Sequence, residues 1–486
     1  MKKFCVAVLV FACVTLFCAC SGGGLDIFYN SNFAPSTDTE NYQYGDVIEN
    51  DFVSASEQNA SYFSLDRNTA SYSMMRRQIN DGLQIAPNSV RLEEYVNYFN
   101  YDYARPQNGE ALALSGGISD CPWNGNHKLF TIGVAAEEIS FENAKPNNLV
   151  FLIDTSGSMY GADRLGLIQQ SFTMLLEGLA DVDYVSIVTY AGDSRVALDG
   201  ARGNEKTLIA NVLQDLSAQG STNGSGGIEK AYRLAEKYFI HGGNNRVILA
   251  TDGDFNVGIS SIDGLKEYIS QKRESGVFLS VLGVGMWNTN DSTMKTLAEN
   301  GNGNYAYLDS VSEARKVLVN ELNGTFNVVA KDAKIGVTFN QEVVESYRLI
   351  GYESKVMSEE EFEDEKKDAG EIGSGHTVTA VYEIQLKQGA SGEVATAEVK
   401  YKTPEDNQSK SISKTYLTSD VVASEDSVFV GCVVEFGLVL RQSKYAPDAN
   451  AEKVAQRLQT LSCVVGESAD PFKTEFLQLV RMFLSK

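Results

Sequence analysis

One short cluster of oxygen-bearing side chains stands out as able to do chemistry. Asp154, Ser156 and Ser158 follow the unbroken apolar run 149–153, and Gly157 between the serines permits a tight turn. One carboxylate and two hydroxyls without His or Cys favour Mg²⁺, Mn²⁺ or Ca²⁺ over zinc or copper. The cluster therefore predicts part of a divalent-cation site, with its shell of oxygen ligands incomplete.

Two later stretches can complete that shell. Thr222 lies in the turn 220–224 and offers a hydroxyl, and Asp252 follows the apolar run 247–250 and offers a second carboxylate. Alone, Asp-x-Ser-x-Ser is no more than a polar turn after a strand. An ordered set of five donors on alternating strands and helices favours a metal site instead.

The segment 147–325 alternates regularly between strand and helix patterns. Helical spacing of Leu and Ile between 165 and 179, and again between 208 and 216, separates the strands, and 195–198 is expected to form an antiparallel edge hairpin. Strands are expected near 148–153, 184–190, 245–251, 277–283 and 304–308. This pattern predicts an α/β fold with a doubly wound, mainly parallel, Rossmann-like sheet. Ligands bind such sheets at the carboxyl ends of strands, where the Asp154 and Asp252 loops fall.

The five donors resemble the metal-ion-dependent adhesion site (MIDAS) of von Willebrand factor type A (VWA) domains. That resemblance implies that Ser156, Ser158 and Thr222 are direct or near-direct ligands, and that Asp154 and Asp252 hold the ion partly through water. It also implies a bound Mg²⁺, or Mn²⁺ or Ca²⁺. One coordination position would stay open for a Glu or Asp carboxylate of a protein partner.

The rest of the chain divides around this segment. Two-residue alternation predicts antiparallel strands at 111–118 and 127–137 and again between 333 and 401, so that the VWA domain is expected to be inserted in a β-sandwich. Two helices are expected between 62 and 103, and the acidic run 358–365 is expected to be a solvated loop. The predicted boundaries are 1–19 signal peptide, 20–58 flexible tether, 59–146 N-terminal helical and β region, 147–325 VWA domain, 326–415 antiparallel β region and 416–486 C-terminal helical region.

The N-terminus has the features of a secretion signal. Lys2 and Lys3 precede an apolar run that is short for a membrane span, and Ala19 stands before Cys20. This pattern resembles a bacterial lipoprotein signal and implies a lipid on Cys20. The N-terminal and C-terminal regions resemble those of bacterial VWA lipoproteins of the YfbK type. Ser21 after the lipidated cysteine then favours an outer-membrane address in the cell envelope.

Composition excludes several classes of function. A net charge of −23 disfavours nucleic-acid binding. Cys121, Cys432 and Cys463 are too few for a disulfide framework, although a bridge between the last two is an alternative to two buried thiols. No phosphate-binding loop or nucleophile elbow occurs, and the three histidines, His127, His241 and His376, have no metal spacing and are expected at the surface or at strand ends.

The favoured interpretation is a lipid-anchored, cation-dependent protein-binding module that is not an enzyme. The alternative is a structural or assembly scaffold of the envelope, in which the metal only stabilises the protein's own loops. A metallohydrolase is the third possibility. The identity of the partner, the choice of ion, the oligomeric state and the face of the outer membrane stay open.

Overall fold

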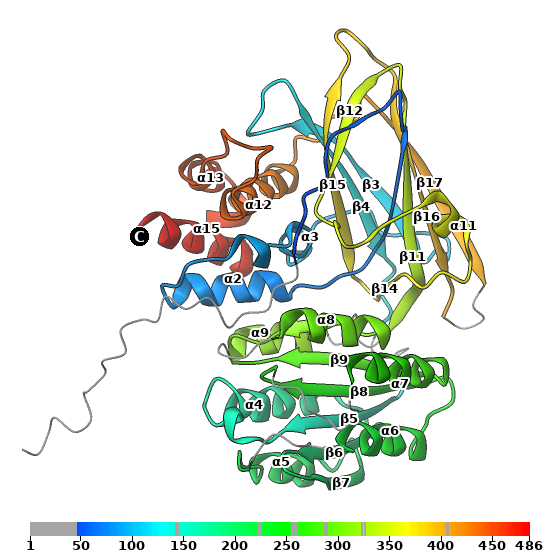
Figure 1. Ribbon diagram of the computed structural model, residues 1–486, viewed down its shortest axis with the longest axis vertical. Coiled ribbons are helices and arrows are strands. Elements are labelled where there is room, and N and C mark those ends of the chain that lie inside the picture. The colour runs from blue at the N-terminus through cyan, green and yellow to red at the C-terminus, as the bar shows by residue number, and fades with distance from the viewer. Residues whose placement is uncertain are drawn as a thin grey trace, which may run out of the picture. The chain divides into compact units, whose positions relative to one another are not determined.

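β5 (Asn147–Asp154) lies in the middle of a six-stranded sheet because its side chains are apolar on both faces. It pairs in parallel with a strand on either side, and one edge of the sheet is antiparallel. The sheet order is β10 (Tyr305–Tyr307), β9 (Val277–Gly283), β8 (Asn244–Thr251), β5, β6 (Tyr184–Tyr190) and β7 (Ser194–Arg202) (Figure 1). The computed structural model describes residues 46–140, 145–220, 226–253, 261–285, 290–321, 324, 327–404 and 408–486.

Alternate residues of β5 belong to two separate apolar cores. Leu149, Phe151 and Ile153 pack with one set of helices, and Phe151 stacks on Phe172 with ring centroids 4.0 Å apart. Val150 and Leu152 pack with the other set. The first set is α4 (Leu165–Leu175), α5 (Lys206–Gln214) and α9 (Val311–Arg315); the second is α6 (Gly227–Lys237), α7 (Ile262–Glu274) and α8 (Asp291–Asn300). The predicted doubly wound α/β fold, with its antiparallel edge, is therefore confirmed.

Two antiparallel sheets form the predicted β-sandwich around a third core. One has the order β1 (Val53–Ser54), β12 (Val344–Ile350), β15 (Thr377–Leu386), β4 (Lys128–Ala136), β3 (Leu112–Asp120), and the other β13 (Val356–Met357), β2 (Ala60–Ser64), β11 (Val328–Phe339), β16 (Glu393–Lys402), β17 (Ser409–Leu417). β4 pairs with β15 across 240 residues of sequence, from Thr377 beside Ala135 to Ile384 beside Lys128. The VWA sheet begins after β4 and ends before β11, so its insertion in the sandwich is confirmed.

Three expectations about the flanking chain are wrong. Val53 and Ser54, placed in the tether, pair with β12, and Asn50 Nδ2 donates to Leu349 O at 3.1 Å, so the tether ends earlier than residue 58. Residues 62–64, placed in a helical segment, belong to β2 because β11 and β13 supply its hydrogen bonds. The acidic run contains a short helix, α11 (Glu359–Glu363), which a capping box at Ser358 begins.

The N-terminal and C-terminal helices share a fourth core. α2 (Ala70–Asn80) and α3 (Leu92–Val96) pack with α12 (Glu425–Arg441), α13 (Ala451–Leu458), α14 (Ser462–Val465) and α15 (Pro471–Leu484). α12 is the buried helix expected from its length, and Cys432 on it is a free, buried thiol, as is Cys121, while Cys463 is free and half-buried. Among the described residues, no helix is long and apolar enough to cross a membrane.

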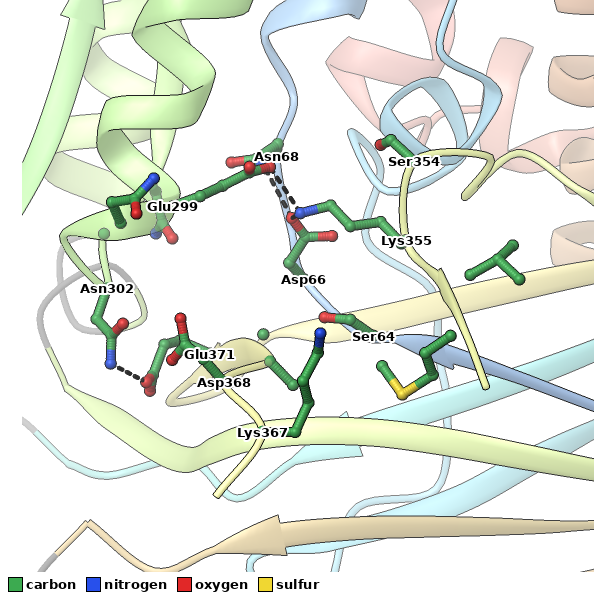
Figure 2. Close-up of a pocket in the computed structure, with 17 residues that line it drawn as sticks. Ser64, Asp66, Asn68, Glu299, Asn302, Ser354, Lys355, Lys367, Asp368 and Glu371 are labelled. Atoms are coloured by element: carbon green, nitrogen blue, oxygen red, sulfur yellow. Dashed lines mark hydrogen bonds and ion pairs between the residues drawn. The ribbon is translucent and has the colours of Figure 1, made fainter. Parts of the chain in front are cut away.

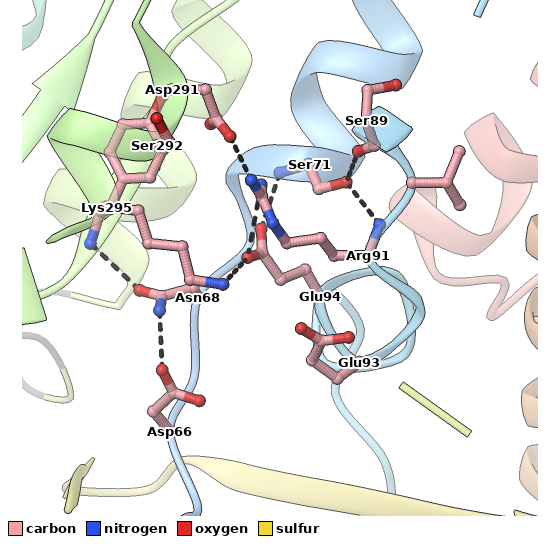
Figure 3. A network of polar contacts seen from close by, with 12 residues as sticks. Asp66, Asn68, Ser71, Ser89, Arg91, Glu93, Glu94, Asp291, Ser292 and Lys295 are labelled. Carbon is pink, nitrogen blue, oxygen red and sulfur yellow. Dashed lines mark hydrogen bonds and ion pairs between the residues drawn. The ribbon is translucent and has the colours of Figure 1, made fainter. Parts of the chain in front are cut away.

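Buried ion pairs join these helices to the VWA domain (Figure 3). Lys295 on α8 donates to Glu94 Oε1 at 2.9 Å, the Ser71 N–H donates to Glu94 Oε2 at 2.8 Å, and Arg91 pairs with Asp291. Burial alone would raise the pKa of Glu94, but Lys295 and Arg91 lower it to about 2. Glu94 is therefore held as a carboxylate inside the protein, fixed to two different parts of the chain.

Candidate metal centre

Asp154 ends β5 with no exposed surface. The N–H of Ser156 donates to Asp154 Oδ1 at 2.8 Å, and Thr251 Oγ1 donates to Oδ2 at 3.3 Å. Thr251 is the last residue of β8, the neighbouring parallel strand. Residues at the carboxyl ends of both strands therefore hold this carboxylate in place. Its position depends on the parallel pairing and does not require a bound ion.

Ser156 and Ser158 are brought together by a single turn of 3₁₀ helix, Gly157–Met159. Their Oγ atoms are 3.0 Å apart. Met159, in the same turn, is fully buried in the apolar core and so fixes the turn to the domain. The Gly157 N–H donates to Gly220 O at 3.1 Å, and Arg164 donates to Ser158 O at 2.7 Å. Both predicted hydroxyl donors therefore lie on a braced turn beside Asp154.

Asp252 follows β8 and is 4% exposed. Gly253 has φ 99° and gives the chain a sharp turn after it, where a side chain would be strained. Burial raises the pKa of Asp154 to about 6, and the charge of Asp252 adds to that effect against opposing hydrogen bonds from Ser156 and Tyr190. The negative charge of Asp252 thus disfavours ionisation of the buried Asp154. A cation bound beside these carboxylates would offset that effect.

The donor chemistry at this edge fits a hard divalent cation. Asp154, Ser156, Ser158 and Asp252 offer only oxygen atoms, the ligands that Mg²⁺, Mn²⁺ and Ca²⁺ take. Over the described ranges, no group of three His, Cys, Asp or Glu side chains is placed to hold a metal. An ion at the ends of β5 and β8 would therefore need the serine hydroxyls as ligands. Its positive charge would be available to a group that approaches from solvent.

Two predicted site residues, Thr222 and Cys20, lie outside the described residues. The described neighbour closest to Thr222 in sequence is Gly220, whose carbonyl meets the N–H of Gly157. The roles of Thr222 as a ligand and of Cys20 as a lipid anchor stay predictions.

Three residues at this edge were not anticipated. Tyr190 ends β6 and is fully buried, and the Thr155 N–H donates to its carbonyl at 2.9 Å. Thr251 and Arg164 hold Asp154 and the serine turn, as described above. Tyr190 and Thr251 both end strands next to β5, so their position at strand ends was a usable signal, whereas nothing local to Arg164 reveals its contact.

The histidines belong to other parts of the structure. His127 and His376 directly precede β4 and β15, at strand ends as expected; His376 is buried and His127 is half-buried. His127 Nδ1 is 2.6 Å from Glu383 Oε1. Burial lowers the pKa of His376 to about 3, so this ring is neutral at physiological pH.

Comparison with known proteins agrees with this fold. The von Willebrand factor type A domain family matches residues 148–325, a family described as von Willebrand factor matches residues 37–131, and the C-terminal family of the uncharacterized protein YfbK matches residues 324–485. YfbK of Escherichia coli (strain K12) is 38% identical over 470 residues, which cover 91% of this chain and 81% of that protein. The chain belongs to the YfbK family of VWA proteins.

Other relatives of this YfbK-family chain are more distant. Inter-alpha-trypsin inhibitor heavy chain H3 of Mesocricetus auratus is 30% identical over 172 residues, 32% of this chain and 18% of that protein. A solved von Willebrand factor type A structure from Catenulispora acidiphila is 14% identical, covers 76% of this chain and 89% of that one, and has a TM-score of 0.41.

Proposed function

We propose that this YfbK-family protein is a divalent-cation-dependent protein-binding module of the bacterial cell envelope, and that it is not an enzyme. One observation carries the proposal. Asp154, Ser156, Ser158 and Asp252 lie at one edge of the parallel sheet, with the two serine Oγ atoms 3.0 Å apart on a braced turn. Mg²⁺, or Mn²⁺ or Ca²⁺, would be held there with Thr222 and would take up a Glu or Asp carboxylate of the partner.

The ion explains how an acidic protein can hold an acidic partner group. The net charge of −23 repels carboxylates at long range. Neutral serine hydroxyls leave the ion with residual positive charge, so the ion supplies the local attraction that the surrounding surface lacks. Added salt should then weaken binding little, because it also screens the repulsion.

The test is capture of partners from envelope extract by the full chain, with Mg²⁺ and with EDTA. Binding is expected with Mg²⁺ only, and Thr222→Ala should remove it, because this change alters the open side of the metal shell. Thr396→Ala serves as the matched control, since this half-buried threonine lies on β16 of the sandwich. Capture that persists in EDTA, or survives Thr222→Ala, would favour the envelope scaffold with a purely structural metal.

The second element of the proposal is a lipid on Cys20 that holds the protein to a membrane, in the outer membrane by the identity of Ser21. Cys20→Ala is expected to move the protein from the membrane fraction to the soluble fraction, or to leave it unprocessed, because no thioether-linked lipid can form. Fractionation and the mass of the mature N-terminal peptide measure this. A processed Cys20→Ala chain that still partitions into detergent would refute the anchor.

A further inference from the structure

A cavity of about 230 Å³ lies on the β-sandwich, between α11 and the strands β11, β16 and β17 (Figure 1). Four lysines and three carboxyl groups line it, whereas the whole chain has 41 basic and 64 acidic residues. The lysines are Lys334, Lys400, Lys402 and Lys410, and the acids are Asp332, Glu363 and Glu365. Cations therefore outnumber carboxylates here, in a chain where the reverse is true.

Strand register brings three of these lysines together with two serines. Lys334 on β11 lies opposite Lys400 on β16, and Lys400 lies opposite Ser411 on β17. Lys402 and Ser409 lie opposite each other in the same way, two residues along each strand. Directly opposite residues of antiparallel strands share a face of the sheet, and so do alternate residues of one strand. Three ammonium groups and two hydroxyl groups therefore belong to one face.

Lys334 is a buried cation that forms no ion pair with any carboxylate in the described structure. It is 4% exposed, and its ammonium donates to the carbonyls of Glu361 at 3.1 Å and Asp364 at 2.6 Å. Burial lowers the pKa of Lys334 and the charge of Lys400 lowers it further, while Asp364 and Asp332 oppose both effects. An ammonium group has three N–H donors, so one donor of Lys334 is left for a ligand.

The other lysines that the described ranges bury all have carboxylate partners. The pairs are Lys295 with Glu94, Lys316 with Glu321 and Lys473 with Asp426, with separations of 2.9, 2.8 and 2.6 Å. Lys355, in the polar cavity beside α8, lies 2.9 Å from Asp66 and 2.6 Å from Glu299 (Figure 2). Charged side chains are seldom buried unless they are paired, so Lys334 is an exception that an anionic ligand would remove.

The neighbouring lysines retain unused donors. Lys400 Nζ lies 2.7 Å from Glu363, and Lys402 Nζ lies 2.6 Å from Asp332. Each of these ammonium groups uses one of its three N–H donors in its ion pair. Both side chains are half-buried, so a ligand can reach them. An anion can therefore bind beside these ion pairs without breaking them.

The donors and the volume indicate the kind of anion. The hydroxyls of Ser409 and Ser411 are on exposed residues and have no hydrogen-bond partner in the part of the chain that the structure describes. Ammonium and hydroxyl donors on three strands suit a phosphate monoester, which has three acceptor oxygens. The volume is below the range of about 300–1,000 Å³ for drug-sized ligands, so the molecule that carries the phosphate must be small.

We propose that this cavity binds a small phosphate monoester, whose oxygens accept hydrogen bonds from Lys334, Lys400 and Ser411. The ligand would place its negative charge against the buried lysine that lacks a carboxylate. A soluble molecule and the headgroup of a phosphomonoester lipid share this chemistry. The site belongs to the sandwich and not to the VWA domain, so its occupation needs no divalent cation.

The experiment is a calorimetric titration of the full chain with glycerol 3-phosphate in EDTA, with glycerol as the uncharged control. One glycerol 3-phosphate is expected to bind per chain, and glycerol at least about tenfold more weakly, because hydrogen bonds between charged groups are the stronger ones. Lys334→Met should weaken the binding about tenfold or more. Lys414→Met removes the same charge from β17 outside the cavity and should have no effect.

Thermal unfolding without ligand checks that Lys334→Met is folded. Ser411→Ala provides a second variant at an exposed position, and the loss of one hydrogen bond should weaken binding about threefold or more. No binding of glycerol 3-phosphate, equal affinity for glycerol, or wild-type affinity in both variants would overturn the proposal.

Vesicles of phosphatidylcholine with and without phosphatidic acid separate the two sources of the phosphate group. Flotation of the wild type with phosphatidic acid only, lost in Lys334→Met, would assign the site to a lipid headgroup. Binding of glycerol 3-phosphate without flotation would assign it to a soluble ligand.

Discussion

Asp154→Asn is expected to abolish the rise in Tm that Mg²⁺ gives the wild-type protein. A ligand present at 100 times its Kd stabilises the folded state by about 2.7 kcal/mol, and the variant should gain almost none of this. The apo variant should stay folded, because the amide oxygen can still accept from Ser156 N–H and the amide nitrogen can donate to Thr251 Oγ1 in place of the present bond. Thermal unfolding in EDTA and in Mg²⁺ measures both effects.

Asp163→Asn is the matched control for that experiment. This side chain is in the loop after the serine turn, is 38% exposed and pairs with Arg77 at 3.3 Å. Replacement of Asp163 should leave the Mg²⁺-dependent rise in Tm unchanged. An equal rise in Tm in Asp154→Asn and in the wild type would show that the ion binds elsewhere.

Arg76→Ala is expected to lower the free energy of unfolding by about 3–5 kcal/mol, the range for breaking a buried ion pair from one side. Arg76 on α2 lies 2.6 Å from Asp309 and 2.7 Å from Glu313, two residues of the VWA domain whose side chains are buried. It also donates to the Tyr98 hydroxyl at 2.7 Å and to Glu475 at 3.0 Å. The alanine variant would leave two buried carboxylates without this cation.

Urea unfolding measures the change, with Arg233→Ala on an exposed site of α6 as the control, expected within about 0.5 kcal/mol of wild type. Adding Asp309→Asn to Arg76→Ala should recover part of the loss, because one of the uncompensated charges is gone. Equal stabilities of Arg76→Ala and Arg233→Ala would contradict this account of the buried pairs.

The VWA sheet was predictable because its strands are buried on both faces. Continuous apolar runs such as 149–153 need no distant partner to be recognised, and the polar residues that follow them must then meet at one edge of the sheet. The neighbourhood of Asp154 and Asp252 follows from this reasoning. Tyr190 and Thr251 were missed although the same argument applies to them.

The errors in the flanking regions have a different physical cause. β1 has two residues and β2 has five, too few for a periodic pattern to be distinguished from loop or helix. Their partners β12 and β11 are far along the chain, so tertiary pairing decides their conformation. α11 was missed because its acidic residues suggest solvation, although Ser358 followed by Glu361 is a helix-start signal.

The buried ions could not be predicted at all. Arg67 pairs with Glu321 at a separation of 254 residues, and Glu94 pairs with Lys295 at a separation of 201. The sequence around a single charged residue does not indicate a partner so far away along the chain.

The most direct measurement of the central proposal is a calorimetric titration of Mg²⁺ into the metal-free wild-type chain and into its Asp154→Ala and Asp252→Ala variants. We expect one Mg²⁺ per wild-type chain and a loss of affinity in each variant large enough to remove the binding heat. Equal Mg²⁺ binding in all three proteins, or none in the wild type, would contradict a metal site at the carboxyl ends of β5 and β8.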